Sequence, residues 1–136
     1  MIYLIGSLRN PRVPIIAQQL RQEGHYVFDD WYAVGPECDT YWREYEQSRG
    51  LTFAEALLAP HATDVFNFDH SHLKKAHCAV LVAPAGRSGH LELGWMIGKG
   101  KPAYILLDSP NPERWDVMYR FATKVCCSVE ELLEVL

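Results

Sequence analysis

Three uninterrupted apolar runs, at residues 2–5, 78–83 and 103–107, constrain the fold of this chain more than any other feature. Apolar runs of this length without alternation are typical of strands that are covered on both faces, as in a parallel sheet. Parallel neighbours need a long crossover connection, which is usually a helix. The segments between the runs are long enough for such crossovers, so the pattern predicts an α/β fold.

The rest of the chain completes an alternation of strands and helices. We expect two further strands at 25–28 and 124–127, and helices at 13–23, 52–58, 62–75, 91–97, 112–121 and 129–136. Residues 31–50 are rich in aromatic side chains and contain Gly35 and Pro36, so they are expected to form a long loop. The predicted fold class is a three-layer, flavodoxin- or Rossmann-like α/β domain over residues 1–136, with a mostly parallel five-stranded sheet and helices on both faces.

The composition narrows the classes of partner. The formal net charge of -4 disfavours broad contact with a nucleic-acid backbone but leaves a small nucleoside or nucleotide possible. The four cysteines form no Cys-x-x-Cys pair, so neither a disulfide framework nor a structural zinc site is expected. The chain opens as a strand rather than a signal peptide and has no membrane-spanning apolar stretch, so we expect a cytoplasmic protein, and we expect no cofactor.

Three predicted segments meet where an open parallel sheet binds ligands, beyond the carboxyl ends of its strands. They are residues 6–10, 29–31 and 84–92. Glycine turns there let a ligand approach the backbone, and amides at the start of a following helix can hold an anion. The candidate substrate-binding residues in these segments are Gly6, Ser7, Arg9, Asp30, Trp31, Arg87, Ser88 and Gly89. The alternative for residues 6–10 is an ordinary strand-to-helix turn.

Glu92 is the most informative single residue, because it lies among Leu91, Leu93 and Trp95 in a predicted helix. An unpaired buried carboxylate is unfavourable, so Glu92 should have hydrogen-bond partners or a shifted pKa. The alternative is a glutamate in the first helical turn that the helix dipole stabilises.

The predicted helix 62–75 carries further candidates. Asp64 and Asp69 are five residues apart and do not share a helix face, and Phe66 lies between them. One aspartate could face a pocket while the other is solvated or caps a helix. The histidines that follow fit no standard zinc spacing, so no metal site is expected.

Three blocks of the sequence resemble the nucleoside 2-deoxyribosyltransferase family and its relatives, the nucleotide N-glycosidases. They are IYLIGSLRNP at residues 2–11, DVFNFDHSHLKKAHCAVLVAPAGRSG at 64–89, and HLELGWMIGKGKPAYILL at 90–107. The blocks occur in the order expected for the family, and the third is the most specific.

The resemblance implies an N-glycosyl-transferring enzyme with three catalytic residues. Glu92 would attack the anomeric carbon of a 2-deoxynucleoside and displace the base, and the covalent deoxyribosyl-glutamate would then pass its sugar to another base. Tyr3 would orient that carboxylate, and Asp69 would transfer a proton at the base. The resemblance also implies small-molecule partners (a nucleoside or nucleotide and a free nucleobase), and a homo-oligomer, a dimer or higher, whose pockets a neighbouring subunit completes.

The loop 86–89 departs from the family pattern, because family transferases often place a sugar-binding aspartate there and this chain has Gly-Arg-Ser-Gly. Related nucleotide hydrolases use serine and arginine near these loops to bind a 5′-phosphate. One alternative is therefore a hydrolase that releases the base from a (deoxy)nucleoside 5′-monophosphate. Alternatives of another class are a non-catalytic nucleotide-binding sensor and a flavodoxin-like electron carrier, since a fold does not fix a function.

Overall fold

The computed structural model describes residues 1–136 and contains one five-stranded sheet in which every neighbouring pair is parallel. The strand order is β2-β1-β3-β4-β5, so the direction of winding reverses between β1 and β3. The strands are β1 Ile2–Ile5, β2 Val27–Phe28, β3 Cys78–Val82, β4 Ala103–Leu106 and β5 Lys124–Cys126. This arrangement confirms the predicted fold class and places the ligand-binding edge at the carboxyl ends of β1 and β3.

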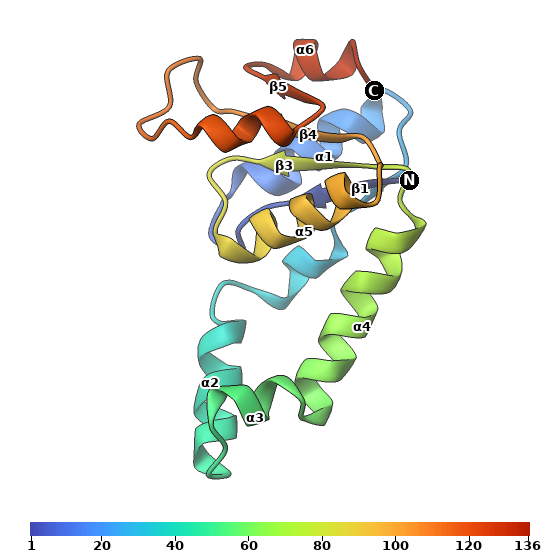
Figure 1. Cartoon of the computed structure of the whole chain (residues 1–136). Helices are drawn as coiled ribbons and strands as arrows, with labels where there is room; N and C mark the ends of the chain where they lie inside the picture. The colour runs from blue at the N-terminus through green and yellow to red at the C-terminus, as the bar shows by residue number, and fades with distance from the viewer.

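Helices cover both faces of the sheet (Figure 1). Side chains alternate along β1, so Ile2 and Leu4 join one core with α1 Arg12–Gln22 and α6 Val129–Leu133. Tyr3 and Ile5 join the other core with α5 Arg87–Gly98 and the last turns of α4 Pro60–Lys75. The catalytic candidate Tyr3 therefore faces α4 and α5.

A helical extension projects from the sheet (Figure 1). It consists of α2 Cys38–Ser48, α3 Phe53–Leu57 and the first half of α4, and we call residues 38–68 the arm. The rest of the chain is called the body. A capping box starts α3, since Thr52 Oγ1 accepts from the Glu55 amide at 3.2 Å and the Glu55 carboxylate accepts from the Thr52 amide at 3.1 Å.

The prediction of a loop over residues 31–50 is wrong, because most of this segment is helical. A 3₁₀ helix, η1, spans Asp30–Val34, and α2 begins at Cys38, just beyond Gly35 and Pro36. The only buried residue of α2 is Glu46, but the sequence does carry apolar residues at helical spacing, namely Cys38, Tyr41, Trp42 and Tyr45. The breakers Gly35 and Pro36, which lie just before the helix, led to the prediction of a loop.

Three other predicted boundaries are wrong. Pro60 starts α4 instead of ending the preceding helix, since proline fits the first helical position. α5 begins at Arg87 rather than at residue 91. The predicted helix 112–121 is only a short 3₁₀ helix, η2 Val117–Phe121, because the segment before it is exposed and contains Pro110 and Pro112.

Candidate active site

The three catalytic candidates lie on the same face of the sheet, on three elements. Tyr3 projects from β1 and is only 1% exposed, Glu92 lies on α5, and Asp69 lies on α4 where the arm joins the body. They lie within electrostatic reach of one another: Glu92 and Asp69 both raise the pKa of Tyr3, and Asp69 raises the pKa of Glu92. The fold therefore brings together residues that are far apart in the sequence.

The carboxyl group of Glu92 is hard to ionise. Burial raises its pKa from the ordinary value of 4.5 to about 7, the nearby Tyr3 hydroxyl opposes this rise by hydrogen bonding, and the charge of Asp69 adds to it. Glu92 is also well beyond the first turn of α5, which contains no acidic residue. The alternative of a first-turn glutamate stabilised by the helix dipole is therefore wrong.

Tyr3 is held as a hydrogen-bond donor. Burial, and then the negative charges of Glu92 and Asp69, raise the pKa of its hydroxyl far above the ordinary value, so it keeps its proton. Its ring packs on Phe28 with 5.1 Å between centroids. Hydrogen bonding between the Tyr3 hydroxyl and the Glu92 carboxyl raises the pKa of Tyr3 and lowers that of Glu92.

Asp69 lies at the junction of body and arm. Burial raises the pKa of its carboxyl, and the positive charge of His72 partly offsets the rise. The charge of Asp69 also raises the pKa of Cys38, the first residue of α2, so Asp69 faces both parts of the molecule. A half-buried carboxyl with a raised pKa is suited to carrying a proton.

A hollow of about 250 Å³ opens at the reversal point of the sheet. It is lined by Ser7, Arg9, Asn10, Pro84, Ala85 and Gly86. Gly86 is the N-cap of α5 and supplies no side-chain cap, so the first-turn amides of that helix have no side-chain acceptor. Helix N-termini of this kind favour anions.

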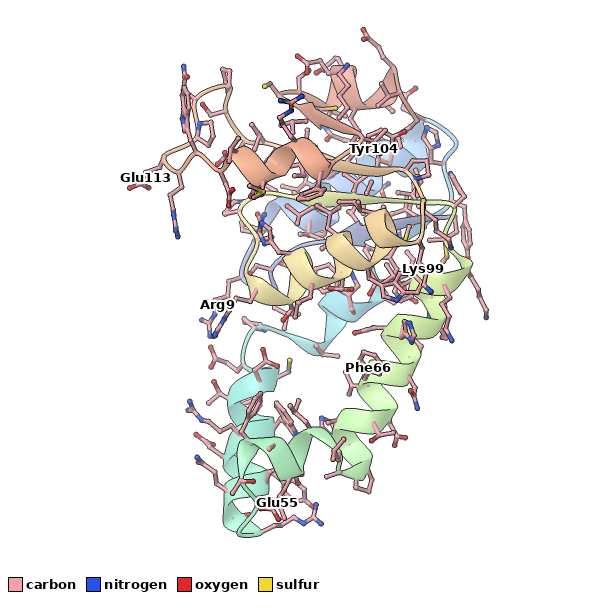
Figure 2. All side chains as sticks on the ribbon, viewed as in Figure 1. Arg9, Glu55, Phe66, Lys99, Tyr104 and Glu113 are labelled. Carbon is pink, nitrogen blue, oxygen red and sulfur yellow. The ribbon has the colours of Figure 1, made fainter.

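Arg9 stands at the mouth of this hollow, on the turn after β1 (Figure 2). Its Nη1 lies 3.7 Å from Glu37 Oε1, and both side chains are more than half exposed. An exposed pair at this distance contributes little free energy, so Arg9 can exchange Glu37 for another anion.

Asn10 and Arg12 are site residues that the sequence analysis missed. The buried Asn10 side-chain amide donates to the carbonyls of Val82 and Pro84 at 3.3 and 3.2 Å. Arg12 Nη1 donates to the Ala83 carbonyl at 2.7 Å. Together they join the turn after β1 to the loop after β3. The sequence feature that could have indicated this role is that both polar residues follow the glycine turn at Gly6.

Three of the predicted substrate-binding residues have packing roles. A Cβ on Gly6 would lie 2.7 Å from Val13 Cγ2, and a Cβ on Gly89 would lie 2.9 Å from Ile5 Cγ2, so both glycines permit close approach of helices to β1. The Trp31 indole donates to the Leu4 carbonyl at 2.8 Å. That bond occupies its N–H group, which is then unavailable to a ligand.

The other predicted residues are distributed over the surface. Ser7 lines the hollow, while Arg87 and Ser88 are exposed in the first turn of α5. Asp30 and Asp64 are exposed on η1 and on the arm. The structure does not bring Asp64 to the catalytic candidates by any contact, and Phe66 stacks on His70 with 5.1 Å between centroids on α4 (Figure 2).

His90 makes a contact that the sequence did not predict. One ring nitrogen, Nδ1, lies 2.7 Å from the Gly86 carbonyl and the other lies 3.0 Å from the Tyr119 hydroxyl. Since a carbonyl only accepts, Nδ1 carries the proton. His90 therefore connects η2 to the start of α5 and is not paired with Glu92.

Two further observations concern metals and membranes. No three histidine, cysteine, aspartate or glutamate side chains gather where they could hold a metal ion, and all four cysteines are free. None of the helices combines the length and the apolar character that a membrane crossing requires.

The chain shares its fold with a solved enzyme. The structure of a 2-deoxyribosyltransferase from the psychrotolerant bacterium Bacillus psychrosaccharolyticus superimposes with a TM-score of 0.64 and 20% sequence identity. The match covers 96% of this chain and 88% of that one. Neither a protein-family model nor a curated protein matches the sequence. At this identity the similarity establishes the fold alone.

Proposed function

We propose that this protein is an N-deoxyribosyltransferase that cleaves the N-glycosidic bond of a 2-deoxynucleoside and passes the sugar to another base. The observation that carries the proposal is the position of Glu92, a sheltered carboxylate with a pKa raised to about 7 beside the buried hydroxyl of Tyr3. The shared fold of a 2-deoxyribosyltransferase supports it.

In the first step, a carboxylate oxygen of Glu92 bonds to C1′ of the sugar as the bond from C1′ to the base nitrogen breaks. The electron pair of that bond leaves with the base, and Asp69 supplies the proton that the base takes up. The transition state resembles an oxocarbenium ion, which a neighbouring carboxylate stabilises. The product is a deoxyribosyl ester of Glu92 and a free base.

In the second step, a ring nitrogen of the acceptor base attacks C1′ and the ester bond breaks, which regenerates the Glu92 carboxylate. The acceptor nitrogen loses its proton to the carboxylate of Asp69, so both residues return to their starting forms. Tyr3 donates to Glu92 when that group is ionised and so aligns it for attack.

The test is intact-mass measurement after incubation with a 2-deoxynucleoside, for the parent and for Glu92→Gln. We expect the mass of the parent, but not of the variant, to increase by one deoxyribosyl group. We also expect the parent to exchange the base when a second base is added. Absence of both the increment and any base release, across purine and pyrimidine deoxynucleosides, would reject the proposal.

A second candidate function is hydrolysis of a (deoxy)nucleoside 5′-monophosphate, in which water replaces the acceptor base. The observation that favours it is the hollow beside Ser7 and Arg9 at the N-terminus of α5, which is suited to a phosphate. Comparing base release from a deoxynucleoside and its monophosphate, in the parent and in Arg9→Ala, separates the two. A monophosphate rate that Arg9→Ala leaves intact argues against the hydrolase.

We also propose that the protein works as a homo-oligomer joined through the arm. Large apolar side chains are exposed there, among them Leu58 at 85%, Tyr41 at 67% and Phe66 at 63%. Exposed apolar patches of this kind mark interaction surfaces. Sedimentation of the parent should give an oligomer that Leu58→Lys weakens, and a parent that remains monomeric at all concentrations would reject this arrangement.

A further inference from the structure

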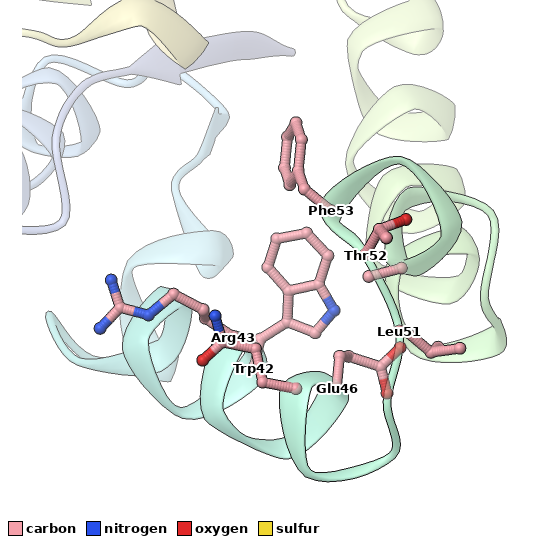
Figure 3. Close-up of a pocket in the computed structure, with 8 residues that line it drawn as sticks. Trp42, Arg43, Glu46, Leu51, Thr52 and Phe53 are labelled. Carbon is pink, nitrogen blue, oxygen red and sulfur yellow. The ribbon is translucent and has the colours of Figure 1, made fainter.

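A second hollow lies in the arm, between α2 and α3 (Figure 3). It has a volume of about 210 Å³ and is lined by Trp42, Arg43, Glu46, Gln47, Leu51, Thr52, Phe53 and Ala56. None of the catalytic candidates and none of the residues at the sheet edge contributes to it. It is therefore a separate site for which the proposed reaction gives no role.

Two buried polar atoms of this hollow have no hydrogen-bond partner. They are the donor Trp42 Nε1 and the acceptor Glu46 Oε2, and they are the only buried side-chain nitrogen and oxygen atoms of the chain in this condition. Glu46 is only 2% exposed. Trp42 and Glu46 are four residues apart, so they share one face of α2. Unpaired buried groups are unfavourable, so a ligand that offers one donor and one acceptor would satisfy both atoms.

The missing partner is not a cation. Glu46 Oε1 already accepts from Arg49 Nη1 at 2.9 Å, which compensates the charge of the carboxylate. Arg43 adds a second positive charge to the lining. The requirement is therefore for a neutral group that donates to Glu46 Oε2 and accepts from Trp42 Nε1.

The walls of the hollow are suited to a flat ring. The rings of Trp42 and Phe53 meet edge to face, with 6.3 Å between centroids and 66° between planes. Phe53 is 71% exposed, so the face of its ring is open to a ligand. Figure 3 shows Phe53 on one side of the indole and Glu46 on the other. A planar ligand can stack on an aromatic wall while its polar edge reaches the floor.

We propose that the arm hollow binds a nucleobase through an edge that carries a hydrogen-bond donor beside an acceptor. An amino or ring N–H group donates to Glu46 Oε2, and the adjacent ring nitrogen or carbonyl accepts from the Trp42 indole. The choice of a nucleobase among planar heterocycles rests on the proposed function, in which free bases are substrate and product. The hollow would hold a base apart from the site of bond cleavage.

The test uses 9-methyladenine as ligand and 9-methylpurine as matched probe. Both have the same ring and a blocked N9, so neither can accept a sugar there, but only 9-methyladenine retains an N–H donor. The indole N–H resonance of Trp42, assigned from Trp42→Phe, is followed by NMR during titration. We expect 9-methyladenine to shift this resonance and 9-methylpurine to leave it in place.

Two variants locate the binding site. In Glu46→Gln, Arg49 should hold the amide oxygen, which puts an NH₂ donor where Oε2 stood, and Phe53→Ala removes an exposed wall without touching the core. Each should weaken binding of 9-methyladenine at least about tenfold, the equivalent of one hydrogen bond. Glu44→Gln makes the same chemical change on the exposed side of α2 and should leave the affinity unchanged.

Several results would overturn the site. One is a Trp42 resonance that 9-methyladenine does not move, which means that Trp42 and Glu46 are satisfied by each other or by water. Another is equal affinity for both probes, and a third is binding that Glu92→Gln abolishes while Glu46→Gln does not. If 9-methyladenine binds as expected but no deoxyribosyl transfer occurs, the proposed function fails and the arm site stands.

Discussion

The body and the arm of this protein differ in which side chains they bury. In the body, the residues of β1, β3 and β4 are all buried, and both cores are closed by helices. In the arm, the only buried residues of α2 and α3 are Glu46 and Ala56, and large apolar side chains face outwards. Both regions expose large apolar side chains, among them Trp115 at 82% in the body and Leu58 at 85% in the arm, so the two regions differ in what they bury rather than in what they expose.

The same contrast applies to the two sheltered glutamates. Glu92 of the body interacts with Tyr3 and Asp69, which tune its pKa. Glu46 of the arm has one oxygen bonded to Arg49 and one oxygen without a partner. In our proposals the body holds the reactive group, while the arm contributes recognition. Asp69, at the junction, connects the two, and four predictions test this division.

The largest effect is expected for Glu92→Gln, which removes the proposed nucleophile of the body. Loss of a covalent nucleophile should lower kcat by at least about a thousandfold. The fold should become more stable at pH 8, by about 1–3 kcal/mol, because a sheltered charge is removed. Urea unfolding of parent and variant at pH 8 measures the second effect.

The pH dependence of stability gives the control for Glu92→Gln. The folded pKa of about 7 lies above the ordinary 4.5, so the folded parent binds more protons than the unfolded chain between these values. The contribution of Glu92 to stability is therefore greatest below about pH 4.5 and is lost as the pH rises through 7. The difference in stability between parent and variant should shrink on acidification. A difference that does not change with pH would mean that Glu92 is not sheltered.

The next largest effect is expected for Asp69→Asn, at the junction. Loss of a general acid should lower the rate by about 10²–10⁴-fold, and less for bases that leave without protonation. Because the charge of Asp69 raises the pKa of Glu92, the variant should also shift the acidic limb of the pH profile to lower pH. Rates with a series of leaving bases test this, and a uniform loss across the series would assign Asp69 to positioning instead.

A smaller effect is expected for Tyr3→Phe. Tyr3 lowers the pKa of Glu92 by hydrogen bonding, so its removal should move the acidic limb of kcat/KM to higher pH than in the parent. The rate at neutral pH should fall by about 2–10-fold, the equivalent of one ordinary hydrogen bond. The measurement is the pH profile of kcat/KM. A limb that moves to lower pH would contradict the proposed role of Tyr3.

The sequence predicted the strands of the body and the arm helices α3 and α4, but it missed α2. The apolar runs of β3 and β4 report burial on both faces directly, so the strands and the fold class followed from them. In α2 the pattern is inverted, because Glu46 is buried while Tyr41 and Tyr45 are exposed. The apolar residues Cys38, Tyr41, Trp42 and Tyr45 still follow helical spacing, so the sequence held a signal for this helix that the expectation of a loop did not use.

The candidate site was predicted in part. Glu92 stood out as a charge among apolar residues, and resemblance supplied Tyr3 and Asp69 as its neighbours. The sequence could not show that Asn10 and Arg12 join two loops, since their acceptors are backbone carbonyls more than seventy residues away. Nor could it show that Gly89 and Trp31 serve packing, because those contacts exist only once β1 is in place.

The smallest effect is expected when the same kind of helix cap is removed in each of the two regions. Thr52 of the arm and Ser128 of the body each accept, through the side-chain oxygen, from a backbone amide three residues on, at 3.2 Å in both cases. Replacing either with alanine should cost its helix about 1 kcal/mol. Because α6 packs on the sheet, Ser128→Ala should lower the global unfolding temperature.

The corresponding change in the arm should remain local. α3 contributes one buried residue, Ala56, so Thr52→Ala should speed amide hydrogen exchange within residues 52–58 and leave the exchange of β1 and β3 unchanged. Exchange measured at single residues, below any denaturing temperature, distinguishes the two responses. If Thr52→Ala lowers the global unfolding temperature as much as Ser128→Ala does, the arm and the body unfold as one unit. The arm would then have to be regarded as part of the folding core rather than as a surface that the body presents.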